Sequence, residues 1–248
     1  MSIVFLTALG VGGATVFGAV IGYLFKSFSL KAKDFVLSFA AGVMLSSSVI
    51  GLILPSLEYG GRLSALVTVI GIFSGALCIK LLSSIIPRVL KGESNYSAER
   101  VTLHRVLVFV SAIAIHNLPE GIAAGVGFGT GNNADAFFIA FGIALQNVPE
   151  GMVIIGPMLA SGVSSKRTFL IAAATGFIEV IGTFIGYLAV SISTVILPFA
   201  LAFAGGTMLY VISDEMIPET HAHGSEQGAT YSLLAGFSLM LLFDFLLN

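Results

Sequence analysis

Long apolar segments, separated by short polar ones, alternate along all 248 residues of the chain. A helix that spans a bilayer needs about 20 mostly apolar residues, so the chain is expected to hold eight transmembrane helices. Their expected ranges are 3–25, 35–57, 64–86, 102–128, 135–160, 168–190, 194–213 and 229–247. The longest polar segments between them, 87–101 and 214–227, are too short for a soluble domain. The pattern therefore predicts an all-α membrane protein with a single transmembrane domain, 1–248.

The composition supports a polytopic membrane protein in contact with the lipid bilayer. The chain is 56% hydrophobic and 10% charged, whereas a soluble domain has about 25% charged residues. The 11 Lys and Arg are scattered and form no basic patch for nucleic acid. Cys78 is the one cysteine, which excludes an intramolecular disulfide.

The basic residues predict the orientation in the cell membrane. Cytoplasmic loops carry an excess of Lys and Arg. If the N-terminus is outside, nine of the 11 basic residues fall on the inner side, Lys80 can reach that side, and Arg62 alone is outside. We therefore expect a multi-pass protein with both termini on the outer side.

A repeat is visible at an offset of 164 residues. Residues 12–24 match residues 176–188 at 7 of 13 positions, and residues 39–45 match residues 203–209 at 5 of 7. The matches pair helix 1 with helix 6 and helix 2 with helix 7, which are five helices apart in order, so the copies would run in opposite directions. We expect an inverted repeat of helices 1–3 and 6–8 flanking a helix 4–5 pair, an arrangement typical of alternating-access transporters.

Three glutamates, Glu120, Glu150 and Glu179, lie well inside expected spans. Each costs about 2.5–3.5 kcal/mol at the bilayer centre on insertion scales. A cation or protonation must compensate this cost. Protonated glutamates bonded to neighbouring helices are one explanation, but each Glu is accompanied by further groups that can bind metal.

One motif occurs twice, 30 residues apart, as HNLPEG over 116–121 and QNVPEG over 146–151. Residues four apart share a face of a helix, so His116 lies above Glu120 and Gln146 above Glu150. Imidazole, carboxylate and amide ligands without thiolate suit borderline divalent ions such as Zn²⁺, Fe²⁺, Mn²⁺, Co²⁺ or Cd²⁺.

These motifs, together with Glu179 in GFIEVIGT, resemble the core signatures of the ZIP (Zrt/Irt-like) metal transporters, closest to the bacterial GufA-like branch. The resemblance covers nearly the whole chain. It implies transport of divalent metal toward the cytoplasm, with zinc as the leading candidate, by motion of the helix 4–5 pair against the scaffold. It also implies a homodimer, and no cofactor besides the transported ions.

The resemblance further implies a two-metal centre. Its first site would comprise His116, Glu120, Gln146 and Glu150, with Met44 as an additional ligand, and its second site would comprise Asn117, Glu120, Asn147, Glu150 and Glu179. Some family members have Asp where Asn147 stands. The neutral amide removes a negative charge and is expected to weaken the second site.

A polar stretch at the end of expected helix 7 resembles the family's acidic, histidine-bearing segment. It is a candidate exit site at the cytoplasmic mouth, or equally a solvated acidic loop. Its candidate ligands are Asp214, Glu215, Glu219, His221 and His223.

Two other classes of protein compete with a metal transporter. A proton-coupled carrier of a small organic solute would use the buried glutamates, but it would not need His116 or the duplicated amides. A membrane metallohydrolase is disfavoured because the chain has no HExxH helix motif. We therefore do not expect an enzyme.

Overall fold

A computed structural model describes residues 2–24, 29–59, 61–90, 111, 114–160 and 162–247. Within these ranges seven helices are long and apolar enough to cross a membrane. They are Ser2–Leu24, Leu30–Tyr59, Gly61–Ile85, Asn133–Gly156, Ser165–Ile192, Leu197–Thr220 and Glu226–Leu247. The eighth expected span, 102–128, lies partly outside the described residues, and its described part is helical over 114–126.

The helices follow one another with short connections. The α-helices are α1 (Ser2–Leu24), α2 (Leu30–Ser46), α3 (Leu54–Tyr59), α4 (Ser64–Leu90), α6 (Asn133–Ala160), α7 (Ser165–Ile192), α8 (Leu197–Val211), α9 (Ile217–Thr220) and α10 (Glu226–Leu247). The 3₁₀ turns are η2 (Gly61–Leu63), η3 (Gly127–Thr130) and η4 (Thr194–Ile196), and the π-helical segments are η1 (Ser47–Ile53) and η5 (Ile212–Met216).

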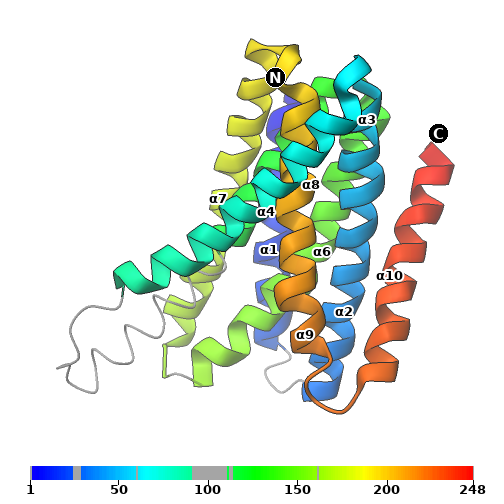
Figure 1. The fold of residues 1–248 in the computed structure, drawn as a ribbon. Coiled ribbons are helices and arrows are strands. Elements are labelled where there is room, and N and C mark those ends of the chain that lie inside the picture. The colour runs from blue at the N-terminus through cyan, green and yellow to red at the C-terminus, as the bar shows by residue number, and fades with distance from the viewer. Residues whose placement is uncertain are drawn as a thin grey trace.

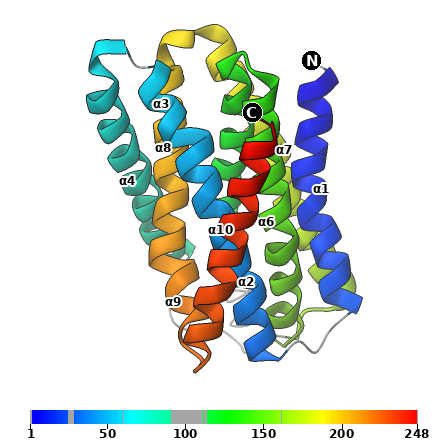
Figure 2. The same cartoon turned by 90° about the vertical axis from the view of Figure 1, so that its right-hand side faces the viewer.

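The two ends of the chain lie at the same end of the bundle, which we call the terminal end (Figure 1). From there α1 runs to the opposite, far end, α2 returns, and α4 runs to the far end again. Segment 114–126 and α6 form the next antiparallel pair, as Figure 2 also shows. Helices α1 and α7 therefore cross in opposite directions.

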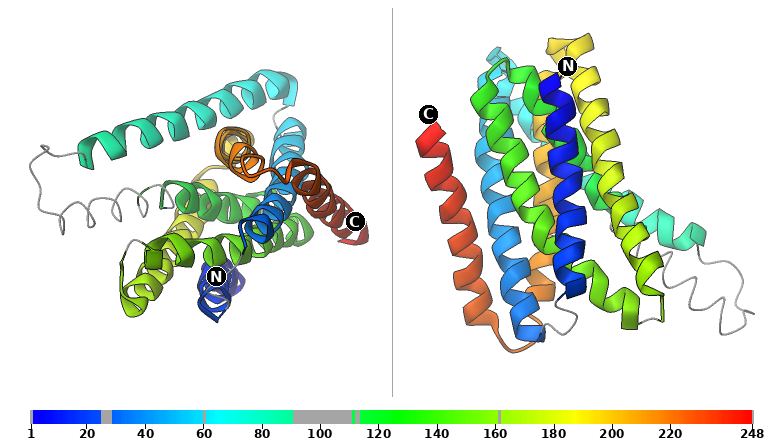
Figure 3. Two further views of the ribbon diagram at one scale, coloured as in Figure 1. Left: turned by 90° about the horizontal axis from the view of Figure 1, so that it is seen from below. Right: turned by 180° about the vertical axis from the view of Figure 1, so that it is seen from behind.

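The bundle divides into two groups of helices, both visible in Figure 3. Helix α1 packs extensively against α6 and α7, and glycine contacts join α7 to segment 114–126. In the other group α2 packs against α10, and α4 against α8. The duplicated motif therefore belongs to a group that contains α1 and α7.

Glycines set the close spacing inside the first group. A Cβ atom on Gly18 would collide with the carbonyl of Val148, and one on Gly182 with the carbonyl of Leu118. Gly18 and Gly182 are 164 residues apart, and Leu118 and Val148 are 30 apart. The glycines are thus separated by the repeat offset of 164 residues, and the residues that they contact are separated by the motif offset of 30 residues. GxxxG-type glycines allow helix backbones this close approach.

The helical span that begins with α8 is longer than the sequence predicts. The expected polar segment 214–227 is wrong in its first part, because η5 and α9 continue the helix to Thr220. Asp214 and Glu215 can stay in the helix since they line an internal cavity, together with His116 and Glu120, rather than face lipid. Only the connection 221–225 remains between α9 and α10.

The half of the bundle toward the terminal end has an apolar core between η1 and α6. Leu52, Ile139 and Ile143 are each 0% exposed there. A Cβ atom on Gly51 would collide with Ile139, so η1 and α6 are in close contact. This packing closes the interior toward the terminal end.

Candidate metal centre

Both copies of the motif converge on one carboxylate of α7. Asn117, on segment 114–126, donates from Nδ2 to Oε1 of Glu179. Asn147, on α6, donates from Nδ2 to Oε2 of the same residue at 2.6 Å and to the carbonyl of Val11 at 3.2 Å. Thr15 of α1 donates to Oε1 at 2.8 Å. Glu179 therefore accepts bonds from all three neighbouring helices.

Several oxygens around Glu179 have no hydrogen-bond partner in the described part of the chain. They include both carboxylate oxygens of Glu120 and the Oδ1 atoms of Asn117 and Asn147. The side-chain oxygen and nitrogen of Gln146 are also without a partner. Buried polar atoms are nearly always paired, so this group of free oxygens fits a cation that accepts their lone pairs.

A cavity of about 570 Å³ reaches two of these residues, Asn117 and Glu120. Its lining residues are Thr15, Leu37, His116, Asn117, Glu120, Glu150, Val153, Ile154, Val211, Asp214, Glu215, Met216, Pro218 and Glu219. Glu120 is 1% exposed at the inner part of the cavity, while Asp214 on η5 and Glu219 on α9 are exposed nearer the far end of the bundle. The cavity thus connects the motif with the far end of the bundle.

Across the described ranges, no three His, Cys, Asp or Glu side chains stand close enough to hold a metal ion. The cavity nevertheless brings His116, Glu120 and Glu150 to one lining, together with an amide. A bound ion would need amide oxygens in addition to carboxylates. The mixed ligand set expected from the sequence has this composition.

Four of the expected ligands are buried but are not among the residues that line the described cavity, namely Met44, Gln146, Asn147 and Glu179. Met44 is 1% exposed and belongs to an apolar cluster that contains Ile139 and Met208. Gln146 lies one residue before Asn147, on α6.

The expected exit residues divide into two sets. Asp214, Glu215 and Glu219 line the cavity, and Oε1 of Glu215 lies 3.2 Å from Nε2 of His116. His221 and His223 are not among the described lining residues.

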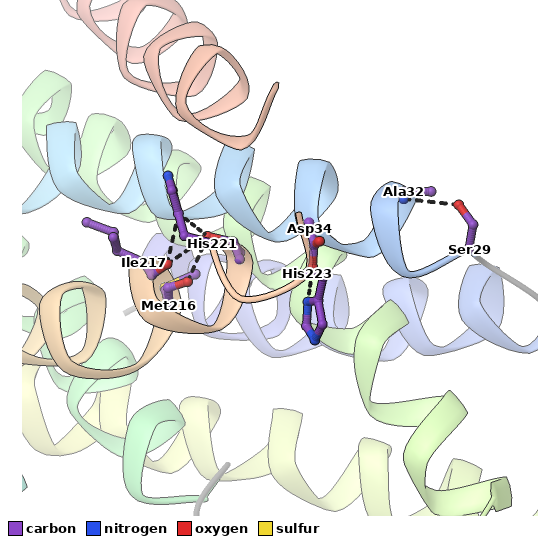
Figure 4. A network of polar contacts seen from close by, with 8 residues as sticks. Ser29, Ala32, Asp34, Met216, Ile217, His221 and His223 are labelled. Carbon is purple, nitrogen blue, oxygen red and sulfur yellow. Dashed lines mark hydrogen bonds and ion pairs between the residues drawn. The ribbon is translucent and has the colours of Figure 1, made fainter. Parts of the chain in front are cut away.

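Both histidines have partners at the far end, shown in Figure 4. Nδ1 of His221 lies 2.9 Å from the carbonyl oxygen of Ile217, and its Nε2 lies 3.1 Å from the hydroxyl of Thr230. Nδ1 of His223 lies 3.0 Å from Oδ1 of the buried Asp34 on α2. The contacts of His221 join α9 to α10, and the contact of His223 holds the turn between them against α2.

Thr15 is the site residue that reasoning from the sequence does not single out. A threonine in a glycine-rich apolar helix has no distinguishing pattern of its own. The signal that could have found it is the repeat, because an offset of 164 aligns Thr15 with Glu179.

The architecture and cavity define a class of protein, namely a multi-pass α-helical membrane protein whose internal cavity carries several acidic side chains and opens toward one end. Residues 92–244 match the family model described as ZIP Zinc transporter. The chain belongs to the ZIP zinc transporter family.

Curated relatives cover nearly the whole chain. It is 36% identical over 247 residues to "Zinc transporter GufA" of Myxococcus xanthus, covering 96% of each protein. It is also 36% identical over 243 residues to "Zinc transporter ZIPB" of Bordetella bronchiseptica, covering 93% of this chain and 77% of that protein. "Zinc transporter ZIP11" of Xenopus tropicalis is 28% identical over 313 residues, with 94% and 93% covered. These matches confirm the resemblance to the GufA-like branch.

Proposed function

We propose that this chain carries divalent transition-metal ions, zinc foremost, across the cell membrane toward the cytoplasm. The observation that carries the proposal is the set of unpaired buried oxygens on Glu120, Asn117 and Asn147, the first two of which line a cavity that reaches the far end. The relatives are named as zinc transporters, and nothing in them supports an organic-solute carrier or an enzyme.

The proposed ligands follow from chemistry and position. His116, Glu120 and Glu150 line the cavity and would provide the strongest ligands, with Gln146 adding an amide oxygen. Two carboxylates match the charge of one divalent ion. Borderline ions such as Zn²⁺, Cd²⁺, Fe²⁺, Mn²⁺ and Co²⁺ accept such mixed nitrogen and oxygen ligation.

A second site would use Asn117, Asn147 and Glu179, with Glu120 and Glu150 shared. Glu179 already accepts three hydrogen bonds, which leaves it less able to bind metal directly. We therefore propose that the main ion lies at the first site, held by the shared Glu120 and Glu150 on the side that faces the amide oxygens of Asn117 and Asn147. Met44 would join only after moving out of the apolar cluster.

Alternating access would follow from an inverted repeat of α1–α4 and α7–α10. The opposite directions of α1 and α7 (Figure 1) and the recurring glycine contacts support this proposal. The far end would be the cytoplasmic end, because it holds Lys31, Lys33, Lys166 and Arg167 near the starts of α2 and α7. In this structure the cavity would then face the cytoplasm, and both termini would be outside.

Release would proceed along the acidic wall formed by Asp214, Glu215 and Glu219. His221 and His223 would join the exit only if their contacts with α2 and α10 opened. We further propose that the protein works as a homodimer, which cross-linking in membranes or native mass spectrometry can test.

The decisive experiment is Zn²⁺ or Cd²⁺ uptake into proteoliposomes loaded with a metal-sensitive dye. Glu120→Ala and His116→Ala are expected to reduce uptake strongly. Glu226→Ala is the matched control, since Glu226 is exposed at the start of α10 and away from the cavity lining. Unchanged uptake in both cavity variants would falsify the proposed function.

A further inference from the structure

The hydroxyl of Thr15 is bonded to the carboxylate on which both motif helices converge. Its Oγ1 donates to Oε1 of Glu179 at 2.8 Å. Thr15 is 1% exposed and Glu179 is 0% exposed, so water does not compete for this bond. A hydrogen bond to a buried charged group is among the stronger ones.

The backbone crossing of α1 and α7 makes this short contact possible. A Cβ atom on Gly12 would collide with the carbonyl oxygen of Gly176, and one on Gly176 would collide with that of Gly12. The contact is reciprocal, and it lies one helical turn before Thr15 and Glu179. Because the backbones touch there, the short side chain of Thr15 on α1 can reach a carboxylate on α7.

The carboxylate in turn fixes two amides. An asparagine side chain offers an oxygen acceptor at one tip and an NH₂ donor at the other. Since Nδ2 of Asn117 and Nδ2 of Asn147 both donate to Glu179, each Oδ1 is directed away from it. Both Oδ1 atoms are buried and unpaired. A cation is attracted by these oxygens and repelled by the NH₂ groups.

We propose that Thr15 is a positioning residue for the metal site. Its hydroxyl holds Glu179 in the orientation that presents the amide oxygens of Asn117 and Asn147 to the ion. This inference rests on the proposed metal transport. Thr15 also lines the cavity, so a change of its side chain acts next to the ion's path.

Position 15 requires a side chain that donates a hydrogen bond and carries no charge. A carboxylate there would face Glu179 and repel it, and an aliphatic side chain would leave Oε1 without one of its donors. A hydroxyl provides the donor without added charge. Threonine and serine therefore meet the requirement, whereas valine has the shape of threonine without the donor.

The test compares Thr15→Val with Thr15→Ser in the full-length protein in detergent. Zn²⁺ affinity is measured by titration calorimetry, and uptake into proteoliposomes gives KM and the maximal rate. Partners that orient metal ligands typically contribute 10- to 100-fold in affinity. We expect Thr15→Val to weaken Zn²⁺ binding and raise KM by about tenfold, and Thr15→Ser to stay within about twofold of the wild type.

A purely structural role would show differently. It would lower the melting temperature of the metal-free protein in Thr15→Val and reduce the amount of folded protein, with KM unchanged. Wild-type affinity in Thr15→Val, or equal losses in Thr15→Val and Thr15→Ser, would overturn the inference. If Thr15→Val does not fold, Thr15→Ala removes the same donor and takes its place in the comparison.

The design separates this inference from the proposed function. If the wild type neither binds nor carries Zn²⁺, the proposed function fails. If the wild type does both, Glu120→Ala does neither, and Thr15→Val matches the wild type, only the role of Thr15 fails.

Discussion

Nε2 of His116 lies 3.2 Å from Oε1 of Glu215, although the two residues are 99 positions apart and on different helices. Both line the cavity, and their side chains are 17% and 37% exposed. The contact joins the motif-bearing helix to η5. It places a carboxylate directly on the path between the buried oxygens and the far end.

Glu215→Ala is expected to slow transport more than it weakens binding. The carboxylate stands on the release side of His116, so its loss removes a transient partner for the leaving ion. We expect a several-fold lower maximal uptake rate with a Zn²⁺ dissociation constant within about threefold of the wild type, consistent with loss of a partly exposed charge. Calorimetry and vesicle uptake measure the two quantities, with Glu226→Ala as control. A large loss of affinity with a normal rate would contradict this role.

Asn147→Asp is expected to change the number of bound ions. The substitution replaces an amide that donates to Glu179 at 2.6 Å by a second carboxylate, and the two repel each other without a cation. The metal-free protein should melt at a lower temperature, and Zn²⁺ stoichiometry should rise from about one toward two by calorimetry.

The control for this substitution is Asn133→Asp at the exposed start of α6. It makes the same chemical change far from Glu179. If the Asn147→Asp protein has the wild-type melting temperature and stoichiometry, the neutral amide of Asn147 is not the reason that the wild type binds about one ion.

Gly12→Ala and Gly13→Ala provide a matched pair on α1. A Cβ atom at Gly12 meets the carbonyl of Gly176, while one at Gly13 meets no atom within 4 Å. Overpacking typically costs about 1–3 kcal/mol, so Gly12→Ala should lower thermal stability and uptake, and Gly13→Ala should leave both near the wild type. Equal behaviour of the two variants would exclude the tight crossing of α1 and α7.

Zn²⁺ affinity is expected to fall as pH is lowered from about 7 to about 5. Imidazole and carboxylate ligands bind metal in their deprotonated forms, so protons compete with the ion and the affinity falls with falling pH. Titrations at three pH values measure the trend, and His116→Ala should show a smaller pH dependence than the wild type. Affinity that stays constant or rises toward acid pH would argue against ligation by His and Glu.

The orientation can be tested with single cysteines in a Cys78→Ser background. Asn133 is exposed at the terminal end and Ala222 at the far end. A membrane-impermeant maleimide added to intact cells should label Asn133→Cys and spare Ala222→Cys until the membrane is permeabilised. The reverse pattern would place the far end, and the mouth of the cavity, outside the cell.

Much of the fold can be predicted from the sequence because apolar runs report directly on membrane spans. Seven expected spans are confirmed, and the family assignment follows from the two motifs around Glu120 and Glu150. Hydropathy does not predict that the helix continues over residues 214–220. A helical segment whose acidic residues face an internal cavity has the same composition as an acidic loop.

The finer geometry of the site could not be derived from residue type. Glu179 resembles an open ligand in the sequence, yet it accepts hydrogen bonds from Thr15, Asn117 and Asn147. His221 resembles an exit ligand but contacts the carbonyl of Ile217. Such partners come from helices distant in sequence, and spacing along one helix does not report on them.

The π-helical segment η5 also constrains how this sequence can change in length. Successive residues of a helix are rotated by about 100°, and a π turn accommodates one residue more than an α turn. Removing one residue from Ile212–Met216 would therefore rotate α9 by about a quarter turn and carry Glu219 away from the cavity. The turn 221–225 can therefore accept an inserted or deleted residue, whereas η5 cannot. A change of length in η5 would point the acidic side chains of the cavity wall in another direction.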